Sequence, residues 1–148
     1  MINLRPYQIE GLASLWKYFQ DGNKGNPLIC WPTGTGKSLC PAAFIEQVMK
    51  IWPGQRFLLL THVSELVKQN AAVMQAIWPN SPIGINSAGL GKRDIVQPII
   101  YGNIQSMYKH PEYFGHRDII FIDEAHLVSQ NDSSMYLKFI NELKNLVL

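Results

Sequence analysis

The stretch that decides the fold is residues 28–38, which read LICWPTGTGKS. Four residues of apolar character lead into a turn that contains Gly34 and Gly36, and Lys37 and Ser38 follow directly. A strand, a glycine-rich turn and a helix are the setting in which successive backbone N–H groups can point at phosphates, with the positive end of the helix behind them. The stretch therefore predicts a buried strand over residues 28–31 and a phosphate-binding loop before a helix over residues 37–51.

The two residues after the glycines have separate roles in such a loop. Lys37 would reach the β- and γ-phosphates, and the hydroxyl of Ser38 would hold Mg²⁺. The general pattern opens with glycine, and the matching position here is Trp31. A glycine-rich turn without any ligand is the alternative interpretation, because short motifs carry false positives.

Two adjacent acids follow the apolar run over residues 119–122, which reads IIFI. They are Asp123 and Glu124, and the carboxyl end of a parallel strand is the edge where open α/β sheets bind ligands. We expect Asp123 to hold Mg²⁺ and Glu124 to orient or deprotonate an attacking water. The alternative is that Asp123 only caps the following loop. The second acid and the upstream glycine loop make this alternative the weaker interpretation.

The rest of the chain alternates apolar runs with helical patterns. Helices are expected from Pro6 onward and over residues 66–77, 104–109 and 133–146, and strands over residues 57–60, 83–85, 99–101 and 119–122. A glycine-bearing loop is expected over residues 87–93. Strands that are apolar on both sides predict a single α/β domain over residues 1–148, with a parallel sheet covered by helices on both faces.

Composition narrows the class of protein. The chain has 148 residues, 47% of them apolar and 16% charged, which is typical of a globular domain. No apolar run approaches the roughly 20 residues that span a bilayer, and the first residues do not resemble a secretory signal. Cys30 and Cys40 lack metal-ligand spacing. We expect a reduced, cytoplasmic protein without a membrane partner, and the net charge of +2 neither requires nor excludes nucleic acid.

The motifs together resemble the N-terminal RecA-like domain of the superfamily-two helicases of the DEAD/DEAH kind. Residues 32–38 resemble motif I, in which the opening glycine is commonly missing, and residues 123–126, DEAH, match motif II. Residues 4–8 are similar to the adenine-reading segment, and residues 60–66, 87–91 and 102–106 resemble the strand-contacting motifs. The resemblance covers nearly the whole chain and is closest to the RadD-type helicases and the restriction-enzyme translocases.

The resemblance implies ATP and Mg²⁺ as the bound groups and assigns residues to them. Its nucleotide-binding positions are Arg5, Gln8, Thr33, Gly34, Thr35, Gly36, Lys37 and Ser38. Its metal ligands are Ser38 and Asp123, and its catalytic positions are Lys37, Glu124 and His126, the last coupling the ATP site to a second domain. Its nucleic-acid contacts are Thr61, His62, Gly89 and Gln105.

The resemblance also implies partners. They are a nucleic-acid strand, with DNA favoured over RNA, and a second RecA-like domain that we expect to be missing from a chain that is a fragment. We therefore expect weak ATP binding, slow hydrolysis and no unwinding by the chain alone. A P-loop kinase or nucleotide transferase is an alternative, against which Glu124 and the lack of an arginine-rich lid segment argue. A non-catalytic fragment that keeps the nucleotide-binding fold is the third possibility.

Overall fold

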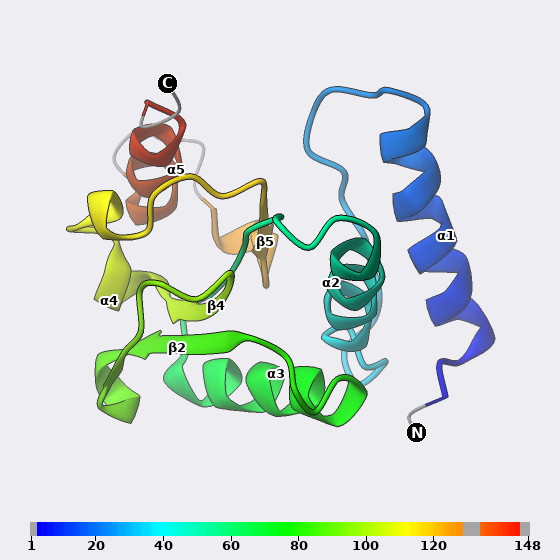
Figure 1. Ribbon diagram of the computed structural model, residues 1–148, viewed down its shortest axis with the longest axis horizontal. Helices are drawn as coiled ribbons and strands as arrows, with labels where there is room; N and C mark the ends of the chain where they lie inside the picture. Colours follow the sequence, from blue (N-terminus) through cyan, green and yellow to red (C-terminus); the bar gives the residue numbers. More distant parts are fainter. Residues whose placement is uncertain (1–2, 129–133, 146–148) are drawn as a thin grey trace.

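A single sheet organises the protein in the computed structural model, which describes residues 3–128 and 134–145 (Figure 1). Its strand order is β3-β2-β4-β1-β5, and β2, β4, β1 and β5 run parallel while β3 is antiparallel to β2. The strands are β1 (Phe57–Thr61), β2 (Ile83–Ser87), β3 (Lys92–Arg93), β4 (Ile99–Asn103) and β5 (Ile119–Ile122).

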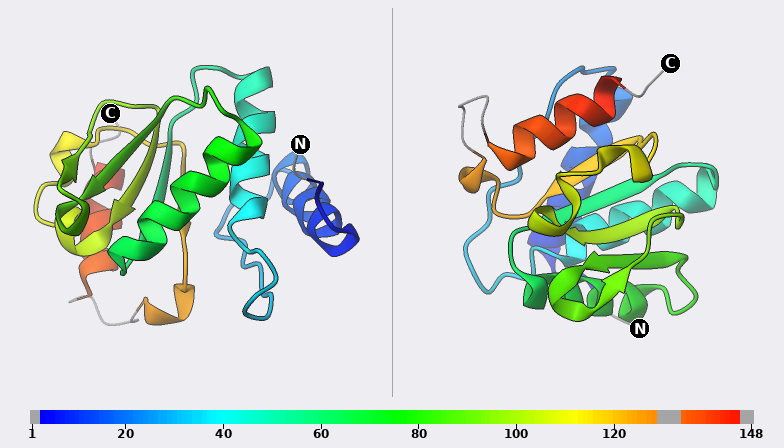
Figure 2. Two further views of the ribbon diagram at one scale, coloured as in Figure 1. Left: turned by 90° about the horizontal axis from the view of Figure 1, so that it is seen from below. Right: turned by 90° about the vertical axis from the view of Figure 1, so that its left-hand side faces the viewer.

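Helices cover both faces of this sheet, as the apolar strands predicted (Figure 2). The helices are α1 (Pro6–Gln20), α2 (Leu39–Ile51), α3 (Ser64–Ile77), α4 (Ile104–Met107) and α5 (Met135–Asn145), and short 3-10 turns occur at η1 (Ala88–Leu90), η2 (Pro111–Tyr113) and η3 (Ala125–Leu127). Helices α1, α2 and α3 lie on one side of the sheet, and α4 and α5 lie on the other.

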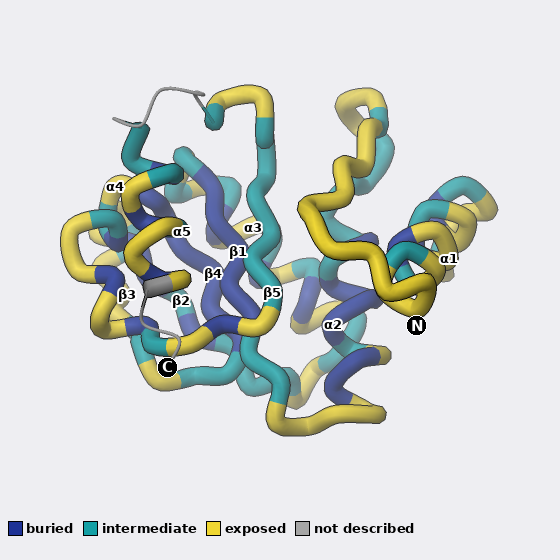
Figure 3. Tube along the Cα trace, turned by 90° about the horizontal axis from the view of Figure 1, so that it is seen from above, coloured by how far each residue is buried: buried dark blue, intermediate teal, exposed yellow. Residues whose placement is uncertain are grey.

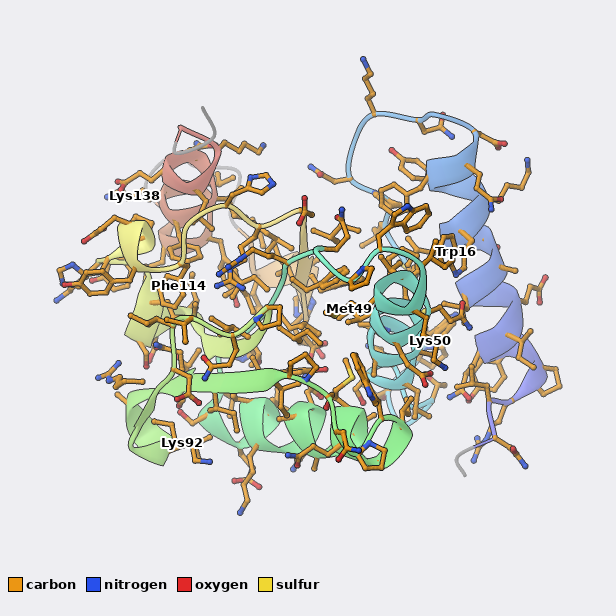
Figure 4. The ribbon with its side chains drawn as sticks, viewed as in Figure 1. Trp16, Met49, Lys50, Lys92, Phe114 and Lys138 are labelled. Carbon is orange, nitrogen blue, oxygen red and sulfur yellow. The ribbon has the colours of Figure 1, made fainter. Side chains whose placement is uncertain are left out.

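Strand β1 shows how the two cores arise. Phe57 and Leu59 belong to the core under α1, α2 and α3, while Leu58 and Leu60 belong to the core under α4 and α5. Successive side chains of a strand point to opposite faces, so an unbroken apolar run fills two cores at once. Trp16 lies in the layer between α1 and α2, and Phe114 lies on the opposite side of the sheet (Figure 4).

The predicted strand over residues 28–31 is wrong. These residues form no regular element, and the side chains of Leu28 and Ile29 are 70% and 38% exposed. Within the described sheet, β5 stands at an edge and pairs with β1. An apolar run becomes a strand only where a neighbour completes its backbone hydrogen bonds. Here the run, light blue in Figure 1, lies apart from β5.

The other helices and strands agree closely with those predicted from the sequence, and they differ mainly in where they begin and end. The loop expected over residues 87–93 contains η1 and the two-residue strand β3, which the polar residues Lys92 and Arg93 did not signal. Helix α2 begins at Leu39 rather than Lys37. Ser133 and Leu146, the expected limits of the last helix, lie outside the described residues. No helix among the described residues is long and apolar enough to cross a membrane.

Candidate nucleotide and nucleic-acid sites

The glycine loop is a tight turn at the start of α2. Gly34 and Gly36 have φ angles of 78° and 73°, in the left-handed region that residues with a Cβ rarely adopt. The Thr35 hydroxyl donates to the Pro32 carbonyl at 2.6 Å, which closes the turn. Ser38 stands at the N-cap of α2, so the loop lies at the positive end of this helix. This backbone geometry fits an anion at the helix N-terminus.

Helix α1 holds the loop in place. The amide of Gln8 is 2% exposed, and its Nε2 donates to the Thr35 carbonyl at 2.9 Å. The Tyr7 hydroxyl donates to the same carbonyl at 2.8 Å, and the Arg5 backbone N–H donates to Gln8 Oε1 at 2.8 Å. Gln8 therefore joins the start of α1 to the glycine loop, while the side chain of Arg5 is exposed.

Trp31 has a packing role at the position where the general motif carries glycine. Its ring meets Tyr7 edge-on at 5.7 Å between centroids. A Cβ added to Gly11 on α1 would overlap the Trp31 ring, so the indole lies directly on the helix backbone. Trp31, which replaces the glycine of the general motif, therefore fixes the chain against α1 just before the loop.

Lys37 and Ser38 are half-buried, and Thr33 is exposed. Within the part of the chain that the structure describes, no ion pair or side-chain hydrogen bond occupies the Lys37 ammonium. Its positive charge is therefore available to a ligand at the loop.

The carboxylates of β5 lie at the carboxyl edge of the sheet. The Asp123 N–H donates to the Leu60 carbonyl at 2.9 Å, which continues the pairing of β5 with β1. Asp123 Oδ1 accepts the Glu124 N–H at 3.1 Å, and Asp123 Oδ2 accepts Nδ2 of Asn70 on α3 at 3.3 Å. The carboxylate is thus oriented from two sides and keeps lone pairs for a further ligand.

Glu124 has a strained backbone. Its φ of 57° and ψ of 51° place it in the left-handed region, and it is the one non-glycine residue with positive φ among the described residues. Such strain clusters at functional sites and costs about 1–3 kcal/mol. His126 Nδ1 lies 3.2 Å from Glu124 Oε2, and the His126 side chain is exposed to solvent.

Tyr136 belongs to the core under α4 and α5, on the face of the sheet opposite to α3 and Asn70. It is 5% exposed, and no hydrogen bond to its hydroxyl occurs within the described residues. Burial, together with the negative charge of Asp123, raises the pKa of Tyr136 to about 12.

The glycine loop and the carboxylate turn lie at the same end of the molecule, on either side of the open edge of β5 (Figures 2 and 3). No hydrogen bond or ion pair links them among the described residues. Those residues also hold no group of three or more His, Cys, Asp or Glu that could bind a metal.

The four predicted nucleic-acid residues lie at the ends of β1, β2 and β4 or just after them. Thr61 is 2% exposed, and its hydroxyl accepts the Val63 N–H at 3.4 Å, so its side chain is turned into the protein. His62 is half-buried, and no partner for its Nδ1 occurs in the described part. Gly89 and Gln105 are exposed. Parallel strands bring these positions to one edge of the sheet.

The segments predicted to contact a nucleic-acid strand also contain four side chains that were not singled out individually, which we call the polar cluster and which are Ser64, Ser87, Asn103 and Ser106. Ser64 Oγ accepts from Ser87 Oγ at 2.8 Å and from Asn103 Nδ2 at 3.4 Å, and Ser106 Oγ accepts the Ala88 N–H at 2.9 Å. The sequence signal for these side chains is a small polar residue at or near the end of an apolar strand. Lys92, labelled in Figure 4, is exposed beside this edge.

Comparisons with known proteins extend these observations. The sequence model of the family described as type III restriction enzyme, res subunit, matches residues 1–148. No curated protein matches the chain in sequence. Among solved structures, the crystal structure of the UvsW helicase from Bacteriophage T4 is similar, with a TM-score of 0.72 and 21% sequence identity. The match covers 98% of this chain and 50% of the helicase chain, so this chain spans about half the length of that protein.

Proposed function

Because this chain belongs to the family described as type III restriction enzyme, res subunit, we propose that it is the ATP-binding part of an enzyme that couples Mg²⁺-dependent ATP hydrolysis to unwinding or translocation on DNA. At the level of the family, the chain is a RecA-like domain of a superfamily-two helicase, a nucleic-acid-dependent ATPase. The nucleotide, the metal, DNA as the strand and the residue roles are the proposal.

The glycine loop is the observation that carries the proposal. Two left-handed glycines, Gly34 and Gly36, shape a turn at the N-terminus of α2, and Lys37 beside them has an unengaged ammonium within the described residues. Backbone N–H groups, the helix dipole and a lysine are the usual donors to a triphosphate. We assign the phosphates to this loop, with Thr33 and Thr35 as its remaining contacts.

Asp123 and Ser38 are the proposed ligands of Mg²⁺. Both offer hard oxygen atoms, which this ion prefers. When bound, Mg²⁺ would neutralise charge on the phosphates during phosphoryl transfer. The chain's own contribution is to hold the Asp123 carboxylate in one orientation, through the Glu124 N–H and the Asn70 amide.

Glu124 is the proposed base that orients or deprotonates the attacking water, which separates a hydrolase from a phosphate-transferring kinase. Its backbone is left-handed, and His126 Nδ1 lies 3.2 Å from its carboxylate. We assign His126 to the contact with a second domain. Arg5 is exposed beside the loop, where it would meet the adenine base, whereas Gln8 is buried with its amide bonded to Thr35 and Arg5 and would support the loop that holds the nucleotide.

Nucleic acid would bind along the carboxyl edge of β1, β2 and β4. Gly89 and Gln105 are exposed there, and the polar cluster supplies hydroxyl and amide groups. Such groups hold the sugar-phosphate backbone without reading sequence. His62 is a further contact, whereas Thr61 is 2% exposed as a whole residue and supports the edge from within.

Equilibrium binding of a fluorescent ATP analogue in the presence of Mg²⁺ tests the proposal. We expect Lys37→Ala to weaken binding about tenfold or more, because a charge-assisted hydrogen bond contributes about 1.5–3 kcal/mol. Lys24→Ala, which removes an exposed lysine from the turn after α1, is the matched control and should bind like wild type. Equal binding by wild type and Lys37→Ala would contradict the proposal and favour a non-catalytic fold.

Activity assays separate the remaining alternatives. ATP hydrolysis that rises with single-stranded DNA, and rises less with RNA, is the expected result. Phosphate transfer to a small acceptor in place of water would instead indicate a kinase or nucleotide transferase.

A further inference from the structure

Helix α3 touches both proposed sites. Its first residue, Ser64, lies in the polar cluster and accepts hydrogen bonds from Ser87 and Asn103. Six residues further along the same helix, Asn70 donates to Asp123 Oδ2 at 3.3 Å. The rise of an α-helix, about 1.5 Å per residue, separates the two positions by about 9 Å along the axis. One regular element therefore joins the nucleic-acid edge to the proposed metal ligand.

Helix α3 is closely packed along its buried face. Val67, Ala71 and Met74 are 0%, 2% and 0% exposed and pack on the sheet. A close-packed apolar face resists local bending, so a displacement imposed at one end reaches the other. A small shift at Ser64 would therefore change the position of the Asn70 amide.

The surroundings of Ser64 leave little room for such a shift to be absorbed locally. A Cβ built on Gly89 would lie 2.6 Å from Ser64 Oγ, so the exposed backbone of η1 rests directly on that hydroxyl. A sugar-phosphate backbone that binds at Gly89 would press on Ser64. Any larger residue at position 89 would already displace the hydroxyl.

We propose that Asn70 is a positioning residue that couples nucleic-acid binding at the polar cluster to the orientation of the Asp123 carboxylate. The inference rests on the proposed function and adds a regulatory contact to it. One carboxylate oxygen is held by the neighbouring Glu124 N–H, which moves with β5. The other is held from α3, so the Asn70 contact links this oxygen to the helix that begins at Ser64.

The test is the ratio of the affinities for a fluorescent ATP analogue with Mg²⁺, measured with and without a saturating single-stranded oligodeoxynucleotide. By linkage this ratio equals the coupling between the two sites. We expect a ratio of about fivefold or more for wild type, within the usual range of coupling. For Asn70→Ala we expect a ratio near one with an unchanged midpoint of urea unfolding, because Asn70 lies at the surface edge of α3 rather than in the core.

Three further variants sharpen the result. Gln69→Ala changes the exposed neighbour of Asn70 on α3 and should keep the wild-type ratio. Asn70→Asp preserves the size of the side chain but removes the donor, so it should lose the ratio as Asn70→Ala does. Ser64→Ala should also lower the ratio, because it changes the nucleic-acid end of α3. The double variant Ser64→Ala with Asn70→Ala should have the same ratio as Asn70→Ala alone, because the two residues act in one path.

The outcomes separate this inference from the proposed function. If Lys37→Ala binds the analogue like wild type, the proposed function is wrong. If Lys37→Ala binds weakly while Asn70→Ala or Asn70→Asp keeps the wild-type ratio, only the coupling role of Asn70 is wrong. A wild-type ratio of one also overturns that role.

Discussion

Arg117 illustrates how much a single residue can organise. Its side chain is 7% exposed and donates to five backbone carbonyls at the amino ends of the strands and in the loops beside them. The acceptors are Phe57 (3.4 Å), Ile95 (3.2 Å), Gln97 (2.8 Å), Pro98 (3.2 Å) and Phe114 (2.9 Å). Burial, and then the charge of Arg56, lower the pKa of Arg117 to about 10, which leaves it charged at neutral pH.

Replacing Arg117 by methionine should destabilise the fold by about 3 kcal/mol. The apolar volume is kept, but several buried carbonyls lose their donor, and each unsatisfied group costs about 1–3 kcal/mol. Urea unfolding measures the change. Arg93→Met is the control, because Arg93 is exposed and makes one 3.5 Å bond, to the Ser106 carbonyl. A similar loss of stability in both variants would show that the carbonyl contacts of Arg117 contribute little.

At the scale of elements, the glycine loop and α1 form one unit. Gly34 and Gly36 share the left-handed backbone, yet their surroundings differ. A Cβ at Gly34 meets nothing within 4 Å, whereas a Cβ at Gly36 would lie 2.9 Å from Gln8 Nε2 and 3.1 Å from Leu39 Cδ1. The second glycine is therefore required by α1 as well as by the turn.

The pair Gly34→Ala and Gly36→Ala tests this difference. The left-handed backbone costs alanine about 1–2 kcal/mol at either position. Gly36→Ala should cost roughly 1 kcal/mol more, because it also displaces the Gln8 amide from the Thr35 carbonyl. Urea unfolding of the two variants gives the comparison. Equal destabilisation would mean that Gln8 does not hold the loop.

Most elements could be predicted because each displays its own periodicity. The residues that became β1, β4 and β5 are apolar runs of strand length, and α3 shows its helical spacing in Val67, Ala71 and Met74. Residues 28–31 have a similar apolar character and yet form no strand. A strand also needs a neighbour, and an apolar run contains no information about which neighbour it will find.

At the scale of the whole molecule, the sheet separates two groups of charged side chains. Asp123 and Glu124 lie at the carboxyl edge of the strands, and Arg56 and Arg117 lie at the amino edge, next to the starts of β1 and β4. Arg117 is engaged with carbonyls there. Arg56 and Arg117 therefore lie away from the proposed ATP site, and Arg5 is assigned to the adenine base, so we propose the second RecA-like domain as the source of an arginine at the phosphates.

The chain alone should consequently hydrolyse ATP slowly and should not unwind a duplex. In related phosphoryl transfer an arginine finger contributes roughly 10³–10⁵ in rate. We expect steady-state ATP hydrolysis, measured with single-stranded DNA present, to rise by about 10³-fold when a second RecA-like domain is joined to this chain. A full rate from the chain alone would contradict the assignment of the arginine to another domain.

The sequence by itself determined the α/β class, the two-sided core and the order of glycine loop and paired carboxylates, because periodicity and local motifs are properties of neighbouring residues. It also placed Lys37 and Asp123 after apolar runs. The tertiary structure alone decided that β4 lies between β1 and β2, that Gln8 holds Thr35 and that Asn70 reaches Asp123. These contacts join residues 27 and 53 positions apart, and only packing selects such partners.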